Sequence, residues 1–354
     1  MDGVAIVYCQ GAFLTANGKT AHGLVRFTKR YKVAAVIDAT VSGDAGTVLD
    51  GKERGIPLVP DVATAIRTAK AKGLVPTHFV MGLAPDGGRL PPSAKEDVKR
   101  AIEAGLNVDS GLHDFLSEDP QIVALAEKHH VRIRDVRKPP ARDELHSFTG
   151  AIEDVRSFRI AMLGTDSAVG KRTTSWMLVH EFERRKIDAE MIGTGQTAWM
   201  QGVKFGIVLD SIVNDFLAGE LENAVVRAWK EERPDVMVVE GQGSLMNPAY
   251  PGGYEILAAT RPHAVVVQHA PTRKDYDGFP GYPIHPLERQ IQALEIVSDR
   301  KVAAITLNTE RLQPSEVDAV TAEIEKDTGL VTVAPLFHGV GRVVDRLDEM
   351  RRAR

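Results

Sequence analysis

The sequence predicts an α/β fold made of two parallel-sheet domains. Three observations carry this prediction. Short β-branched runs alternate with amphipathic stretches of helical length, which is the pattern of parallel sheets with crossover helices. The pattern stops in a basic, proline-containing stretch and then starts again. A length of 354 residues also suits two domains. We place the boundary after residue 140, which gives domains at residues 1–140 and 141–354.

The first domain has the elements of one parallel sheet. Apolar runs predict strands at 4–8, 33–37, 77–81 and 107–109, and amphipathic stretches predict helices at 62–72 and 93–104. Asp38, Gly82 and Ser110 each follow a strand, so we expect them at the carboxyl edge, where α/β folds bind ligands. The stretch 128–142 is dense in Lys, Arg and His, and we interpret it as a solvated linker rather than a phosphate-binding segment.

The second domain repeats the alternation. Strands are expected at 158–163, 190–192, 235–239, 264–268, 302–307 and 330–334. A helix should run from residue 171 to about 185, and a longer one from 211 to about 231. The sequence contains no internal repeat and no low-complexity segment.

The first strand of this domain runs into a glycine-bounded loop and then into a helix. The loop reads Gly164-Thr-Asp-Ser-Ala-Val-Gly-Lys171. Backbone N–H groups at the start of such a helix point at a bound anion, and Gly170 permits close approach. The ammonium of Lys171 reaches the terminal phosphates. The sequence therefore predicts a P-loop NTPase-like domain that grips the phosphates of a nucleotide-type ligand.

Two departures from the usual phosphate loop bear on the chemistry. Five residues, not four, separate the first glycine from the glycine–lysine pair, and Thr165 occupies the usual glycine site. The residue after the lysine normally supplies a hydroxyl to Mg²⁺, but here it is Arg172, and the hydroxyls come later, at Thr173 and Thr174. Phosphate binding survives both changes, whereas Mg²⁺-dependent phosphoryl transfer is less secure. We predict no resident metal, because the extra guanidinium suits a ligand held mainly by charge.

Other polar residues follow strands of the same domain. Glu240 ends a buried strand before a glycine-rich turn, so it could hold a metal-bound water, act as a general base or serve as a cap. Asn308 ends another strand and could read a purine edge or close a structural turn. Arg273 and Lys274 lie in a polar run that begins at His269. Because the carboxyl ends of parallel strands share one edge, these groups should lie beside the phosphate site.

The composition limits the partners. There are 44 Lys plus Arg against 48 Asp plus Glu, so the net charge of -4 gives no reason to expect nucleic acid or an anionic membrane. The single Cys9 fits a reducing compartment. Without a secretory leader or an apolar run near the roughly 20 residues that span a bilayer, we expect a cytoplasmic protein acting on a small molecule. An apolar stripe over residues 212–229 could serve the core or a subunit interface; core is the commoner answer, and we expect a homo-oligomer.

The phosphate loop and the turn at Glu240 resemble segments of known families. The phosphate loop and the Val-Glu240-Gly-Gln-Gly turn look like those of dethiobiotin synthetase. Over nearly its full length the chain is more similar to a family with a Rossmann-like N-terminal half and a P-loop C-terminal half. Some members of that family are D-amino-acid N-acetyltransferases that use acetyl-CoA and D-glutamate. The resemblance implies that the loop residues bind phosphates and that Glu240 lies at the reacting centre. The candidate cofactor-binding residues are Gly164, Thr165, Gly170, Lys171, Arg172, Thr173, Thr174 and Asn308.

Three readings of the function compete. An acetyl-CoA-dependent N-acetyltransferase needs a base for the substrate ammonium, donors for the developing oxyanion and a clamp for the substrate carboxylates. The candidates are Glu240 or Asp166 as the base, Ser244 with the loop amides as donors, and Arg172, Arg273 or Lys274 as the clamp. The alternative is an ATP- and Mg²⁺-dependent ligase or kinase. The third reading is a nucleotide sensor without catalysis. The replaced hydroxyl favours the acetyltransferase.

Overall fold

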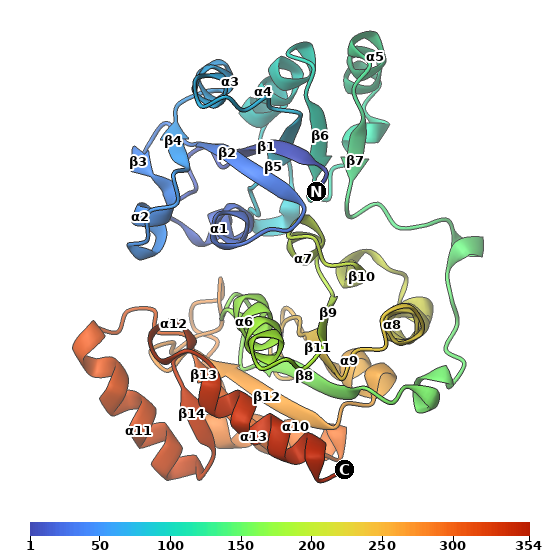
Figure 1. Ribbon diagram of the computed structural model, residues 1–354, viewed down its shortest axis with the longest axis vertical. Coiled ribbons are helices and arrows are strands. Elements are labelled where there is room, and N and C mark those ends of the chain that lie inside the picture. Colours follow the sequence, from blue (N-terminus) through green and yellow to red (C-terminus); the bar gives the residue numbers. More distant parts are fainter. The chain divides into compact units, whose positions relative to one another are not determined.

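The computed structural model describes residues 1–354, leaving out the side chain of Asp86. The chain divides into two compact units, which we call the N-terminal unit (Met1–Pro140 with Gln196–Val203) and the C-terminal unit (Ala141–Gly195 with Lys204–Arg354). Each unit contains one seven-stranded sheet (Figure 1). The predicted α/β fold with two parallel-dominated sheets is confirmed.

The sheet of the N-terminal unit has the order β3-β4-β2-β1-β5-β6-β7. Neighbouring strands are parallel except β3 and β4, which are antiparallel. Figure 1 shows α3 and α4 on one side of this sheet and α1 on the other. The strands are β1 (Gly3–Tyr8), β2 (Tyr31–Ile37), β3 (Gly43–Asp44), β4 (Pro57–Val59), β5 (His78–Met81), β6 (Asn107–Ser110) and β7 (Ile133–Asp135). The helices are α1 (Lys19–Arg26), α2 (Ala45–Asp50), α3 (Val62–Ala71), α4 (Pro92–Glu103) and α5 (Pro120–His129).

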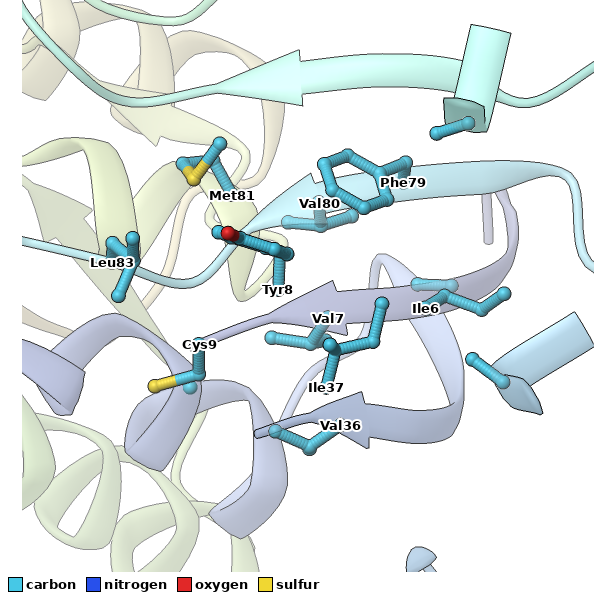
Figure 2. Close-up of a cluster of buried hydrophobic side chains, with 14 of the residues drawn as sticks. Ile6, Val7, Tyr8, Cys9, Val36, Ile37, Phe79, Val80, Met81 and Leu83 are labelled. Carbon is cyan, nitrogen blue, oxygen red and sulfur yellow. The ribbon is translucent and has the colours of Figure 1, made fainter. Parts of the chain in front are cut away.

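The core of this unit is formed by the three central strands. Figure 2 shows the side chains of β1, β2 and β5 gathered in one cluster, with Ile6, Ile37 and Phe79 among the labelled residues. The strands read as near-continuous apolar runs because both faces of a parallel sheet are covered. At the carboxyl edge, the buried Asp38 accepts hydrogen bonds from the backbone N–H of Phe13 and Thr40, 2.9 Å each. Its carboxylate therefore holds the loop that follows β1.

The segment Gln196–Val203, expected in the second domain, groups with the N-terminal unit instead. It contains the short helix α7 (Gln196–Met200). The hydroxyls of Thr197 and Thr20 lie 2.7 Å apart, and the Gln201 amide donates to the Gly23 carbonyl at 2.9 Å. These side-chain contacts join residues about 180 positions apart in the sequence. No local sequence pattern indicates contacts between residues so far apart. A single boundary at residue 140 therefore left this segment in the second domain.

The sheet of the C-terminal unit is wholly parallel, with the order β10-β9-β11-β8-β12-β13-β14. On one face α6 and α13 contact the sheet and each other, and α8, α9 and α10 form a second connected group of helices. The strands are β8 (Phe158–Gly164), β9 (Ala189–Gly193), β10 (Phe205–Gly206), β11 (Val236–Glu240), β12 (Ala264–His269), β13 (Val302–Leu307) and β14 (Val331–Val333). The helices are α6 (Lys171–Arg184), α8 (Asn214–Glu231), α9 (Tyr254–Thr260), α10 (Leu287–Ser298), α11 (Val317–Thr328), α12 (Pro335–His338) and α13 (Gly341–Arg352).

The predicted linker also needs correction. Within the stretch 128–142, Ile133–Asp135 forms β7 and pairs with β6. The strand is short and only partly buried, so its sequence carries no clear alternation. The apolar stripe is divided: Leu221 and Val225 are buried in the core, whereas Ile212 and Phe216 are half-buried. Among the described residues, no helix is both long and apolar enough to cross a membrane.

Candidate functional site

The phosphate loop has the predicted strand, loop and helix arrangement. β8 ends at Gly164 and α6 begins at Lys171. Gly170 has φ +105°, a conformation that side-chain-bearing residues rarely adopt. At Gly164, a Cβ atom would lie 2.9 Å from the Gln268 carbonyl oxygen, so the backbone of β12 leaves no room for a side chain. Both glycines are therefore required by the shape of the loop.

Lys171 is more enclosed than a helix-start lysine is expected to be. Its side chain is buried, and Nζ donates to the carbonyl oxygens of Asp166 at 2.7 Å and Gly243 at 2.8 Å. The ammonium thus ties the phosphate loop to the turn after β11. Two loops therefore enclose this lysine.

Asp166 is the point where the loop is anchored. Its carboxylate is fully buried and accepts four hydrogen bonds. Oδ1 accepts from Ser167 N at 2.7 Å and Asn247 Nδ2 at 2.8 Å, and Oδ2 accepts from Arg273 and Asp277 N, 2.8 Å each. A carboxylate has about four lone-pair positions, so little acceptor capacity is left for a substrate proton. The geometry favours Glu240 over Asp166 as the base and gives Asp166 a holding role.

Arg273 is engaged on all of its N–H groups. Nε and one terminal nitrogen donate to the Glu310 carboxylate at 2.6 and 3.0 Å. The remaining donors go to Asp166 and to the carbonyls of Ser167 and Ala168. A substrate carboxylate would have to displace one of these partners. The predicted clamp is therefore better served by Lys274, which is exposed next to this cluster.

Glu240 lies at the end of β11, one strand away from the phosphate loop. It is 4% exposed, and Oε2 accepts a hydrogen bond from Thr194 N at 2.9 Å. Burial raises the pKa of the Glu240 carboxyl, and the positive charges of Arg172 and Lys171 and the backbone N–H of Thr194 partly oppose this rise. A carboxylate with a raised pKa beside an anion-binding loop is a candidate general base.

The hydroxyls that follow the lysine do not share one role. Thr174 Oγ1 donates to Gln268 Oε1 at 2.6 Å, and Thr306 Oγ1 donates to the same oxygen at 2.7 Å. Thr174 is therefore fixed inside the unit. Thr173 is half-buried at the first turn of α6. Of the two displaced hydroxyls, Thr173 is the one left to contact a ligand.

Ser244 has a buried hydroxyl without a hydrogen-bond partner among the described residues. The residue is 2% exposed and follows Gly243, whose carbonyl binds Lys171. An unsatisfied buried polar group costs roughly 1–3 kcal/mol, so the Ser244 hydroxyl is a candidate ligand-binding group beside the phosphate loop. Asn308 is placed differently, since Oδ1 accepts from Glu310 N at 2.9 Å and closes a turn. Its amide nitrogen remains the candidate for a purine edge.

His269 is a site residue whose role the sequence did not indicate. It ends β12, and its Nδ1 lies 3.0 Å from the hydroxyl of Thr165. Burial lowers the pKa of the His269 imidazole to about 4. The signal that could have found it is its place one residue beyond Gln268, which pairs with Gly164 at the start of the loop. Asn247 was also missed, because a loop position far from the phosphate loop gives no sign of its bond to Asp166.

Comparison with known proteins agrees with this architecture. A family model described as "Domain of unknown function (DUF1611_C) P-loop domain" matches residues 146–344, and one described as "Domain of unknown function (DUF1611_N) Rossmann-like domain" matches residues 39–139. A crystal structure of a DUF1611 family protein from Anabaena variabilis is 29% identical, with a TM-score of 0.89 over 98% of this chain and 99% of that one.

Two curated relatives carry a functional name. A protein named D-glutamate N-acetyltransferase from Tritonibacter scottomollicae is 32% identical over 290 residues, 80% of this chain and 85% of the relative. A protein of the same name from Pseudoalteromonas sp. is 31% identical over 276 residues, 76% of this chain and 80% of the relative. With both domains matched and these relatives aligned over most of their length, the chain belongs to the DUF1611 family.

Proposed function

We propose that this protein moves the acetyl group of acetyl-CoA to the amino group of a D-amino acid, D-glutamate first. The names of the two relatives support the reaction and the acceptor. The phosphate loop supports a donor that carries a pyrophosphate, with Lys171 and Arg172 supplying positive charge to it. No metal is required, because acyl transfer develops no charge on a phosphoryl group.

The observation that carries the proposal is the position of Glu240: this enclosed carboxylate ends β11 beside the phosphate loop and accepts a hydrogen bond from Thr194 N at 2.9 Å, and burial raises its pKa. Only the free amine attacks a thioester, so the enzyme must take a proton from the substrate ammonium. A carboxyl group with a raised pKa is a stronger base than an ordinary one and suits that step. The amine nitrogen then forms a bond to the acetyl carbon, the carbon–sulfur bond breaks, and the sulfur leaves as a thiolate that takes up a proton.

The other site residues fit the remaining needs of this reaction. The orphaned Ser244 hydroxyl could donate to the carbonyl oxygen as negative charge develops on it. Lys274 could bind a carboxylate of the acceptor as a point charge, while Arg172 is taken up by the phosphates of the donor. The alternative, an ATP- and Mg²⁺-dependent ligase or kinase, also uses the loop. It is weakened because the Thr174 hydroxyl is already bound to Gln268.

The test is thiol release in the absence of metal. With EDTA present, acetyl-CoA and D-glutamate should yield free thiol, and in a parallel reaction with Mg²⁺ and without EDTA, ATP and D-glutamate should yield no ADP. L-Glutamate in place of D-glutamate reports the stereochemical preference of the acceptor site. Consumption of Mg²⁺-ATP with untouched acetyl-CoA would replace the acetyltransferase by the ligase. Binding of nucleotide or CoA without any turnover would support a sensor.

A further inference from the structure

The threonine at the usual glycine position of the loop has a partner. Thr165 is completely buried, and its Oγ1 lies 3.0 Å from Nδ1 of His269. Phosphate binding does not call for a hydroxyl here, because backbone N–H groups and Lys171 perform it. A threonine in place of the usual glycine is explained if its hydroxyl serves to orient the His269 imidazole through a hydrogen bond.

The direction of this hydrogen bond follows from the surroundings of the hydroxyl. Among the described residues, Nδ1 of His269 is the one acceptor within reach of Thr165 Oγ1. If Nδ1 carried the ring proton and donated it, the buried Thr165 proton would be left unsatisfied, at roughly 1–3 kcal/mol. Thr165 therefore donates, Nδ1 accepts, and the single proton of the neutral ring sits on Nε2.

The ring is neutral in this position. Burial lowers the pKa of His269 to about 4, and no charged neighbour contributes to the shift. At pH 7 the imidazole therefore has one N–H group and no charge. A neutral imidazole can polarise a carbonyl oxygen by donating a hydrogen bond from its N–H group. It keeps that proton, because the neutral ring is not acidic near neutral pH.

The position of the ring places this donor at the ligand edge of the sheet. Thr165 N donates to the Gln268 carbonyl at 3.0 Å, so His269 lies alongside the first residues of the phosphate loop. His269 is only partly buried, and the described contacts give its Nε2 no protein partner. A donor oriented by Thr165 and without a protein acceptor is available to a substrate.

We infer that the Thr165–His269 pair presents an uncharged Nε2–H donor to the carbonyl oxygen of the transferred acyl group. His269 is then a catalytic residue of the proposed acetyl transfer, on which this inference rests, and Thr165 is a positioning residue that fixes its tautomer. The N–H···O bond strengthens as the carbonyl oxygen becomes an oxyanion and relaxes when the carbon–sulfur bond breaks. No proton is transferred through the imidazole.

The tautomer is tested by nitrogen-15 NMR of the histidine-labelled protein, with the His269 signals assigned by their loss in His269→Gln. In the wild type at pH 7, Nε2 should be protonated and Nδ1 should show the shift of an unprotonated ring nitrogen. Thr165→Val should give a mixture of tautomers, and Thr165→Ser should restore the single one. Thr332→Val is a matched control, because the buried Thr332 hydroxyl bonds only the Leu330 carbonyl among the described contacts.

The donor role is tested by kinetics. Removing one oxyanion donor costs on the order of 10²-fold in kcat, so His269→Ala should lose about that much, with the KM for acetyl-CoA changed by less than about threefold. Thr165→Val should lose part of this rate and Thr165→Ser should regain it. His263→Gln is the matched control, since this second enclosed imidazole lies just before the other end of β12 and accepts from Arg159 N. If His269→Ala does not fold, His269→Gln takes its place: this variant keeps an N–H donor and should lose less than the roughly 10²-fold in kcat expected when the donor is removed.

Several results would overturn the inference. A protonated Nδ1 in the wild type, or an active wild type whose kcat is unaffected in His269→Ala, removes the donor while leaving acetyl transfer in place. A rise in KM with unchanged kcat would place His269 on a phosphate or carboxylate. A wild type that releases no thiol from acetyl-CoA would remove the proposed function itself, and with it the acyl oxygen as the target.

Discussion

Replacing Asp166 by alanine should lower the stability of the fold rather than remove a group that takes part in acetyl transfer. The substitution removes the acceptor of four hydrogen bonds and leaves the Arg273 guanidinium, 9% exposed, without one of its two carboxylates. Removing one partner of a buried ion pair costs about 3–5 kcal/mol. Because Arg273 keeps Glu310, whose side chain is 28% exposed, we expect the lower end, about 3 kcal/mol. For a domain of this size that lowers Tm by roughly 6–12 °C.

The assay is thermal unfolding followed by circular dichroism, with turnover measured on the folded protein well below Tm. Asp345→Ala is the control, because Asp345 pairs with Arg185 from a side chain that is 62% exposed and should change stability by less than about 0.5 kcal/mol. An Asp166→Ala variant with unchanged Tm and abolished turnover would refute the holding role. Asp166 would then be the base, and its four hydrogen bonds would have to rearrange when substrate binds.

Three further predictions concern the other charged groups. Lys171→Ala should weaken CoA binding about 10- to 150-fold by calorimetry, from a lost contact of about 1.5–3 kcal/mol, and should also lower Tm because the Asp166 and Gly243 carbonyls lose their donor; unchanged affinity would place the ligand elsewhere. Glu240→Gln should cut turnover by about 10²-fold or more. This variant should also become more stable relative to the wild type as pH rises above 4.5. In the wild type the Glu240 carboxyl ionises there when the chain is unfolded, whereas the raised pKa of the folded state opposes its ionisation, so the wild type loses stability. A loss of stability in Glu240→Gln would instead make Glu240 a cap. Arg172→Thr should weaken CoA binding without creating an efficient ATPase, and fast ATP hydrolysis by this variant would count against the assigned role of Arg172.

Long apolar runs are what made the fold predictable from the sequence. The six strands expected in the second domain correspond to β8, β9 and β11–β14, each within about two residues at either end. β3, β4, β7 and β10 have only two or three residues each, too few to display a period. Sheet pairing, rather than local sequence, determines these short strands. The same holds for α7, whose grouping with the N-terminal unit rests on contacts distant in the sequence.

The location of the site was predictable from the sequence, but the hydrogen-bond and ion-pair partners within it were not. Parallel topology requires that Gly164, Glu240 and His269 come to one edge, and strand ends can be read from the sequence. Whether a charged group is free or already bound depends on partners about 70 to 110 positions away, as with Lys171 on Gly243 and Arg273 on Asp166. Burial, which raises the pKa of Glu240 and lowers that of His269, is likewise a property of the packed unit. These contacts changed the roles expected for Asp166 and Arg273.

The most direct test of the account is identification of the product. The wild type should be incubated with isotopically labelled acetyl-CoA and D-glutamate in EDTA, with L-glutamate and the Glu240→Gln variant in parallel. Mass spectrometry should then detect labelled N-acetyl-D-glutamate formed in proportion to free CoA, with little product from either control. If the label stays on CoA while, in a parallel reaction with Mg²⁺ and without EDTA, ATP and an amine or carboxylate substrate are consumed together, the phosphate loop serves phosphoryl transfer and the acetyltransferase account is wrong.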